Sequence, residues 1–140
     1  MLVNSRDVEI EWGDCDAAGI VFYPRYFAMF DASTAYLLEK ALGCKKIAWT
    51  KKYGIVGIPM VDTGAKFSIP SGYGDVITIE SRAVDIRRSS FDIEHRVLKD
   101  GKLAIEGHET RVWTGRDPAD TSRIKAVAIP DEVVAALSGG

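Results

Sequence analysis

The chain has 140 residues, a formal net charge of -2 and 46% hydrophobic residues, the composition of an ordinary globular protein. This length predicts a single domain, residues 1–140. The charge gives no reason to expect nucleic acid or an anionic membrane as a partner. No apolar run approaches the roughly 20 residues needed to span a bilayer.

The N-terminal residues 1–6 are too few and too polar for a secretion signal, so we expect a cytoplasmic protein. The two cysteines, Cys15 and Cys44, match no metal-ligand spacing and are expected as free thiols. His95 and His108 fall within strand patterns, where structural roles are expected. We therefore expect neither a metal site nor a cofactor.

The spacing of the apolar residues changes near residue 24 and predicts a strand followed by a helix. Val8, Ile10 and Trp12 alternate with acidic residues, which predicts a strand with these three side chains buried. From residue 24 to about 42 the apolar spacing becomes helical, and Gly43 suits the C-cap. One face of this helix is expected to be buried and the other, including Met29, to lie opposite; the buried face would carry Phe27, Phe30, Thr34, Leu37, Leu38 and Ala41.

Asp31 interrupts the predicted apolar face of this helix. At 100° per residue its side chain projects into the middle of the stripe. A buried carboxylate must be paired or hydrogen-bonded. Asp31 is therefore either a structural aspartate or a residue that faces a pocket.

The rest of the chain reads as strands separated by short breaks. Asp100-Gly101 is a strong hairpin signal. The predicted order is a connecting helix (45–53), an irregular strand entry (54–61), an alternating run (65–69), a turn (70–75), three strands (76–86, 90–98, 103–113), a polar loop (115–122), a short strand (124–129) and a helical turn (131–137).

One long helix among hairpin-linked strands predicts an α+β architecture. The simplest arrangement is an antiparallel sheet curved around the helix at residues 24–42. Such a sheet keeps exposed edges, which favour pairing between subunits. We therefore expect a homodimer.

The turn between the first strand and the long helix carries the candidate chemistry. Gly19 permits backbone angles closed to other residues, so Asp16 can lie near the helix start. Free N–H groups around Phe22 and Tyr23 would then bind a developing oxyanion, and Asp16 would act as a nucleophile or general base. The alternative is an Asx turn and helix cap without catalysis. Asp14 is expected only to brace the turn.

A second candidate site lies between two predicted strands, at Arg87, Arg88 and Ser90. Arginines and hydroxyls beside a sheet edge can hold phosphate groups. A neighbouring pair of arginines is also common on solvated surfaces. The sequence leaves both interpretations open.

The run WGDCDAAGIVFYPRY at residues 12–26 resembles the signature of the hotdog-fold acyl-CoA thioesterases of the 4-hydroxybenzoyl-CoA thioesterase type. The resemblance continues through Asp31-Ala32, through Gly54-Ile55-Val56-Gly57 and Pro59, and through Arg87-Arg88 with Ser90-Phe91. It extends to about Trp113.

This resemblance implies a hotdog fold, with five or six antiparallel strands wrapped around the long helix. It also implies a homodimer or a homotetramer made of two dimers, acting on an acyl-CoA substrate. Asp16 would attack the thioester carbonyl or activate water, and the Tyr23 N–H would polarise that carbonyl. Gly19 belongs to the same motif.

The resemblance also implies the binding residues. Arg87, Arg88 and Ser90 would contact the phosphates of coenzyme A. Asp31 would line the acyl pocket of its own subunit or of a neighbouring one. Ile58 and Pro59 would lie near the acyl group.

This chain departs from the family pattern at Ala17, Phe22 and Ile58, where the closest family motif has proline, tryptophan and threonine. The resemblance therefore implies either an aromatic or a short acyl group. A hotdog hydratase usually uses a histidine at the helix entry, which this turn lacks. A non-catalytic acyl-CoA-binding protein is the remaining alternative.

Overall fold

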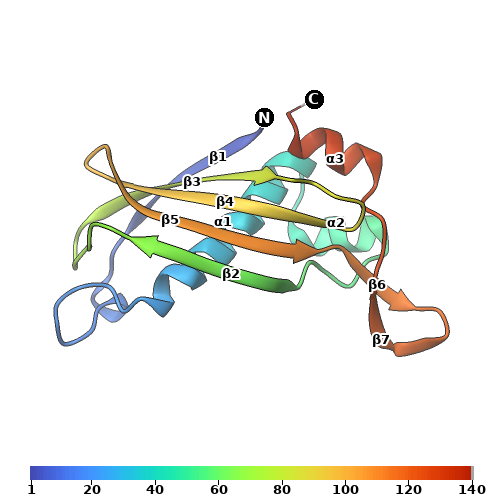
Figure 1. Ribbon diagram of the computed structural model, residues 1–140, viewed down its shortest axis with the longest axis horizontal. Coiled ribbons are helices and arrows are strands. Elements are labelled where there is room, and N and C mark those ends of the chain that lie inside the picture. Colours follow the sequence, from blue (N-terminus) through green and yellow to red (C-terminus); the bar gives the residue numbers. More distant parts are fainter. Residues whose placement is uncertain (140) are drawn as a thin grey trace.

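The computed structural model describes residues 1–139 (Figure 1). The elements follow in the order β1 (Val3–Glu9), a 3-10 turn η1 (Trp12–Asp14), α1 (Pro24–Leu42), α2 (Lys46–Tyr53), β2 (Met60–Phe67), β3 (Val76–Val84), β4 (Ser90–Lys99), β5 (Lys102–Val112), β6 (Thr114–Asp117), β7 (Asp120–Ala126) and α3 (Asp131–Leu137). No helix within residues 1–139 is long and apolar enough to cross a bilayer.

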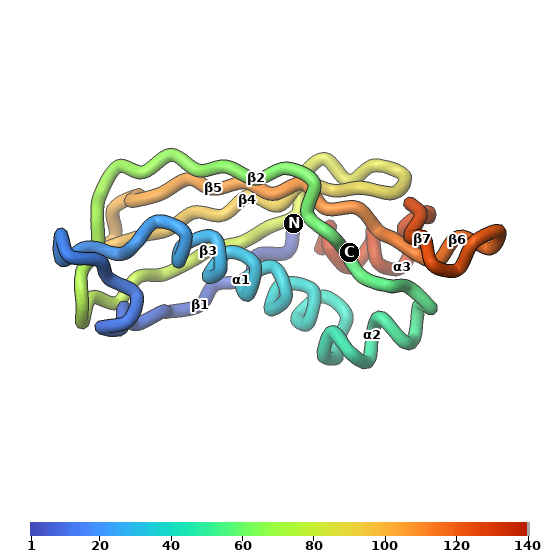
Figure 2. Tube along the Cα trace, turned by 90° about the horizontal axis from the view of Figure 1, so that it is seen from below, coloured from blue at the N-terminus to red at the C-terminus, as the bar shows by residue number. Residues whose placement is uncertain are grey.

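Five strands form one antiparallel sheet in the order β1-β3-β4-β5-β2. The sheet curves around α1, which lies against one of its faces (Figure 2). Along β3 and β4 the buried residues alternate with less buried ones, so one face of each strand packs on the helix. The predicted α+β architecture is confirmed.

Helix α1 has the predicted bounds, and Gly43 ends it in the left-handed conformation at φ 73°. Its buried face is rotated from the predicted one, because Met29 is only 9% exposed and packs in the core. The prediction that Met29 lies opposite the buried face is therefore wrong. The helix buries Tyr26, Met29, Phe30, Ser33, Thr34, Leu37 and Leu38.

The first strand ends earlier than its alternation predicts. β1 stops at Glu9, Ile10 is fully buried, and Trp12 lies in the 3-10 turn with 78% of its surface exposed. The expected burial of Trp12 is wrong. The chain leaves the sheet after Ile10, whose backbone bonds with Gly74 and Asp75.

Two further predictions need correction. The second strand begins only at Met60, and the preceding Gly57 makes an isolated bridge to Thr114. The expected polar loop at 115–122 is instead most of a two-stranded ribbon, β6 and β7, which projects from the body (Figures 1 and 2). Every residue of β7 is exposed, so no apolar alternation marks it in the sequence.

Two apolar clusters fill the space between α1 and the sheet. Between them lies a polar cluster, which we define as Thr34, Ser81, His95, Glu109 and Arg111, all buried. Its members come from α1, β3, β4 and β5.

The position of the Phe30 ring beside the polar cluster depends on Gly107. Phe30 stacks on His95 with ring centroids 4.7 Å apart. A Cβ atom at Gly107 would lie 2.7 Å from the Phe30 ring, so only glycine lets α1 approach β5 this closely.

Candidate active site

The turn between β1 and α1 is closed by its own backbone. Cys15 and Val21 form an antiparallel bridge, and the Asp16 N–H donates to the Ile20 carbonyl at 3.0 Å. Gly19 takes φ 80°, the left-handed conformation that favours glycine. The chain therefore doubles back at Gly19, as predicted.

Asp14 braces this turn, as expected. Its Oδ2 accepts a hydrogen bond from the Glu11 N–H at 2.9 Å, and its carbonyl accepts one from the Phe22 N–H at 2.8 Å. The second bond joins the start of the turn to the residues just before α1. It also occupies the Phe22 N–H, so the prediction of a free amide at Phe22 is wrong.

The Asp16 carboxylate is exposed at the tip of this turn. Its Oδ1 accepts a hydrogen bond from the Ala18 N–H at 2.9 Å, which is an Asx turn. Within residues 1–139, Oδ2 has no hydrogen bond, so one carboxylate oxygen is available to a ligand. Asp16 lines a 410 Å³ cavity together with Trp12, Cys15, Ala17, Gly19 and Tyr73.

The start of α1 offers one unpartnered amide. Pro24 has no N–H, while the N–H groups of Arg25 and Tyr26 donate to the carbonyls of Phe22 and Tyr23. The Tyr23 N–H donates to no group within residues 1–139. Since helix N-termini carry partial positive charge, this amide is suited to a carbonyl oxygen that gains negative charge.

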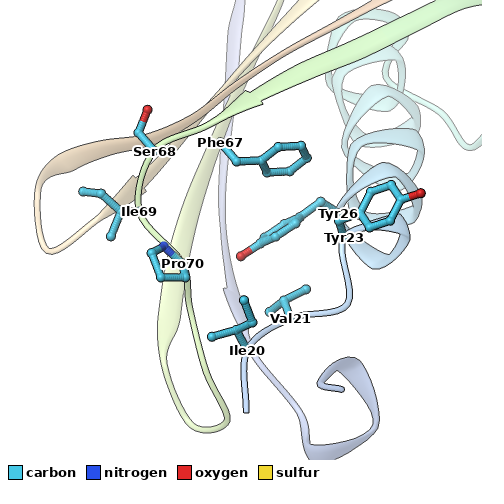
Figure 3. Close-up of a pocket in the computed structure, with 8 residues that line it drawn as sticks. All are labelled: Ile20, Val21, Tyr23, Tyr26, Phe67, Ser68, Ile69 and Pro70. Atoms are coloured by element: carbon cyan, nitrogen blue, oxygen red, sulfur yellow. The ribbon is translucent and has the colours of Figure 1, made fainter. Parts of the chain in front are cut away.

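An apolar pocket of 190 Å³ flanks the same helix start (Figure 3). The Tyr26 hydroxyl points into this pocket, whereas the Tyr23 ring lies on the other side of Tyr26. Tyr26 is almost fully buried, and its hydroxyl has no hydrogen-bond partner among residues 1–139. The other residues that line the pocket are Ile20, Val21, Phe67, Ser68, Ile69 and Pro70.

Asp31 lies on the rim of the buried face of α1. Its side chain is 62% exposed, and its Oδ1 accepts a 2.7 Å hydrogen bond from Arg111 Nη2. The expected position in the middle of the buried stripe is wrong. Both interpretations of the residue fit in part, because Asp31 is paired and is also accessible to a ligand.

Ile58 and Pro59 lie in the segment before β2. Ile58 is buried, and its carbonyl accepts a hydrogen bond from Arg111 Nη1 at 3.1 Å. The Pro59 carbonyl accepts one from the Val112 N–H. The structure therefore brings Ile58 and Asp31 to one side chain, Arg111.

The Arg87–Ser90 segment connects β3 to β4 at the other end of the sheet from the Asp16 turn (Figure 1). β3 has nine residues, which span about 30 Å.

The two arginines of this segment differ in their bonding. Arg87 Nε donates a hydrogen bond to Ser90 Oγ at 2.8 Å, and Arg87 Nη2 donates one to Asp92 Oδ1 at 2.8 Å. The bond to Asp92 raises the pKa of Arg87. Arg88 is exposed, and its guanidinium makes no bond within residues 1–139.

The polar cluster was not identified as a functional group from the sequence. Thr34 Oγ1 donates to Glu109 Oε1 at 2.6 Å, so His95 Nε2, at 3.3 Å, must donate to the Thr34 oxygen. Ser81 Oγ lies 2.7 Å from the other nitrogen of His95.

Glu109 stays ionised inside this cluster. Burial by itself raises the pKa of Glu109, but bonds with His95, Arg111 and Thr34 outweigh burial and lower this pKa to about 2. A signal for the cluster was present: Glu109 and Arg111 are charged residues two apart within a buried strand.

Comparisons with known proteins agree with this geometry. Residues 10–137 match the thioesterase-like superfamily. The chain is 35% identical over 133 residues to the 4-hydroxybenzoyl-CoA thioesterase of Pseudomonas sp. (strain CBS-3), which covers 89% of this chain and 90% of the relative.

Solved structures extend the similarity to the fold. Two structures of 4-hydroxybenzoyl CoA thioesterase align with a TM-score of 0.86, at 32% and 31% identity, covering 96% of this chain and 98% of theirs. The first is from Pseudomonas sp. strain CBS-3, and the second is a variant with asparagine in place of an aspartate, complexed with 4-hydroxybenzoyl CoA. A gentisyl-coenzyme A thioesterase aligns with a TM-score of 0.79 at 29% identity, covering 96% and 99%. The chain therefore belongs to the thioesterase-like superfamily, as a thioester hydrolase with the hotdog fold.

Proposed function

We propose that this protein hydrolyses the thioester of an aromatic acyl-CoA to the free acid and CoA. The observation that carries the proposal is the presence, in one hydrogen-bonded turn, of an exposed carboxylate at Asp16 and an unpartnered N–H at Tyr23. Two of the aligned relatives are named as thioesterases of 4-hydroxybenzoyl-CoA and gentisyl-coenzyme A, and these names support an aromatic acyl group.

The chemistry requires an electrophile and a carboxylate. The Tyr23 N–H donates to the thioester oxygen and stabilises the negative charge that develops there. Asp16 either attacks the carbonyl carbon, releasing CoA and leaving an anhydride that water cleaves, or takes a proton from a water that attacks directly. In both routes the C–S bond breaks, water supplies the new C–O bond, and the CoA sulfur receives a proton.

The distance along α1 fits an aromatic acyl group. Asp31 follows Tyr23 by eight residues, which is about 12 Å along the helix axis. A hydrogen bond of about 3 Å at each end leaves about 6 Å, the span of a benzoyl group with a distal hydroxyl. We therefore place Asp31 at the far end of the acyl group, with Ile58 and Pro59 beside it.

The phosphates of CoA are assigned to Arg87, Arg88 and Ser90, with Arg88 as the side chain free to bind them. Because β3, about 30 Å long, runs between this segment and the end of the sheet near the Asp16 turn, we place the two regions in different copies of the chain. A second copy supplies the missing region in a homodimer, or in a homotetramer of two dimers. The free outer edge of β2, with Val61 and Phe67 exposed, supports such pairing.

The cysteines bear on the compartment. Cys15 and Cys44 are both free thiols. Free thiols are typical of reducing compartments, which supports a cytoplasmic enzyme.

The role of Asp16 is tested by Asp16→Asn. We expect turnover of 4-hydroxybenzoyl-CoA, measured by thiol release with DTNB, to fall at least about 10³-fold, because asparagine neither attacks nor accepts a proton. Binding of the same substrate, measured by calorimetry, should persist. Asparagine still offers an oxygen to the Ala18 N–H, so the turn should be retained.

Asp100→Asn is the matched control, because Asp100 lies in the β4–β5 hairpin and asparagine tolerates its positive φ. This variant should keep full activity. Near wild-type turnover in Asp16→Asn would rule out the mechanism. Binding without turnover in the unsubstituted protein would instead indicate a non-catalytic acyl-CoA-binding protein.

The phosphate assignment is tested by Arg88→Ala. Loss of one exposed phosphate contact should raise KM for the acyl-CoA about tenfold and leave KM for the matching acyl-pantetheine unchanged. Arg123→Ala, on the exposed β7, is the control. Equal changes on both substrates would contradict the assignment.

A further inference from the structure

Arg111 joins two segments that the family resemblance assigns to the acyl end of the site. Its Nη2 donates to Asp31 Oδ1 at 2.7 Å, on α1, and its Nη1 donates to the Ile58 carbonyl at 3.1 Å, before β2. Its Nε donates to Glu109 Oε1 at 3.0 Å. The Arg111 side chain is only 6% exposed, so these three acceptors define the plane of the guanidinium.

The bond to Arg111 orients the Asp31 carboxylate and leaves half of it free. Asp31 Oδ1 is held by Arg111, whereas Oδ2 makes no hydrogen bond within residues 1–139. The side chain is 62% exposed, so Oδ2 is accessible to a ligand. The contact therefore presents a hydrogen-bond acceptor in a fixed direction.

The charges of Arg111, Glu109 and Asp31 favour an acyl group that carries a hydrogen-bond donor. Arg111 carries one positive charge, while Glu109 and Asp31 each carry a negative one, which leaves a net charge of -1. The pKa of Glu109 is lowered to about 2, so the Glu109 carboxylate stays ionised throughout the neutral range. A neutral acyl group with a hydroxyl is attracted to such a site, and an anionic acyl group is repelled.

We propose that Arg111 is a positioning residue that orients Asp31 and the Ile58 carbonyl at the acyl end of the site, and thereby sets the preference for acyl groups that carry a distal hydrogen-bond donor. The inference rests on the proposed thioesterase function and deepens it. Arg111 acts through Asp31 and Ile58, because its own guanidinium is buried behind them.

Lysine cannot replace Arg111 in this role. A guanidinium reaches three acceptors through donors fixed in one plane, whereas an ammonium is a single point on a flexible stem. In Arg111→Lys the positive charge beside Glu109 is retained, but the two-sided contact with Asp31 and Ile58 is lost. This substitution therefore separates orientation from charge.

The experiment compares 4-hydroxybenzoyl-CoA with benzoyl-CoA, which differ only in the distal hydroxyl. In the unsubstituted protein kcat/KM should favour the hydroxylated substrate by about 10- to 100-fold, the effect of one hydrogen bond to a charged group. Arg111→Lys should lower kcat/KM for 4-hydroxybenzoyl-CoA much more than kcat/KM for benzoyl-CoA, and so remove most of this preference. Asp31→Asn should do the same, and the Asp31→Asn/Arg111→Lys double variant should lose no more than either single variant.

Two further variants control for folding. Arg82→Lys changes an arginine that pairs with Glu94 at 2.8 Å outside the polar cluster, and it should leave the preference intact. If Arg111→Lys does not fold, the pair Glu109→Gln/Arg111→Met removes both buried charges together and avoids an unpaired one. That pair should show the same loss of preference.

The outcomes separate this inference from the proposed function. Equal losses on both substrates, or a preference that survives in Arg111→Lys and in the charge-free pair, overturn the role of Arg111. An unsubstituted protein that hydrolyses both substrates equally well also overturns it. Retained turnover in Asp16→Asn overturns the proposed mechanism instead and leaves the orientation of Asp31 to be judged from binding of the two acyl-CoAs.

Discussion

The Asp16 turn and the polar cluster beneath α1 are built in opposite ways. The turn is closed by backbone bonds between near neighbours, such as the Asp16 N–H to the Ile20 carbonyl, and its carboxylate is exposed. The polar cluster is closed by side chains distant in sequence, since Thr34 and Glu109 are 75 residues apart.

This difference teaches that the proposed reactive carboxylate contributes little to the stability of the fold, whereas the polar cluster contributes much. Asp16 is held by the turn and supports little around it, so its carboxylate can be changed with small structural consequence. Glu109 and Arg111 are buried charges that neutralise each other in a low-dielectric interior, so either one becomes costly when its partner is removed.

The largest expected effect is on folding, from Glu109→Ala. This substitution leaves the buried Arg111 guanidinium and His95 without their shared partner, which should cost about 3–5 kcal/mol of unfolding free energy. Urea unfolding followed by circular dichroism measures the loss.

The matched change in the turn is Asp14→Ala. It removes the side-chain bond to the Glu11 N–H and should cost only about 1 kcal/mol, as for an ordinary capping residue. Comparable losses in Glu109→Ala and Asp14→Ala would break the contrast between the two regions.

The buried Glu109 carboxylate should also make the stability of the fold depend on pH. The pKa of Glu109 is about 2 in the folded chain and near its ordinary value of 4.5 when unfolded, so between these values only the unfolded chain binds the proton. The stability contributed by Glu109 is therefore complete above about pH 4.5 and is lost as the pH falls toward 2. Thermal unfolding from pH 6 to pH 2.5 measures it.

Other carboxylates contribute to the same acid region, because the pKa values of Asp75, Asp92 and Asp120 are also lowered. The informative quantity is the difference between the unsubstituted chain and Glu109→Gln. That difference should shrink steadily as the pH is lowered. A difference that does not vary with pH would show that Glu109 is not the titrating group.

Local patterns in the sequence were sufficient for the elements that have a local cause. The 3.6-residue period and Gly43 define α1, and Asp100-Gly101 adopts two positive φ angles, 51° and 76°, in the β4–β5 hairpin as such a turn requires. The same reasoning failed for Trp12 and for β7. A 3-10 turn follows β1, and a fully exposed ribbon has no buried face to produce alternation.

The residues of the candidate site could be predicted from the sequence, but the hydrogen bonding of its backbone amides could not. The 12–26 motif alone predicts Asp16, Tyr23 and Gly19 as site residues, since the residues that shape the turn are contiguous. Only the hydrogen bonds of the folded backbone show that the Phe22 N–H is occupied and that the Tyr23 N–H has no partner within residues 1–139.

The sequence by itself determined the long helix and the carboxylate in the turn before it, because each follows from spacing along one short stretch. It also determined the α+β class, because that class follows from the order of the predicted elements. Only the tertiary structure decided that Asp31 is exposed and held by Arg111, 80 residues away, and that Ile58 shares the same guanidinium. Those contacts depend on how α1, β5 and the segment before β2 pack together. Periodicity along a single element carries no information about which distant side chain meets a charge.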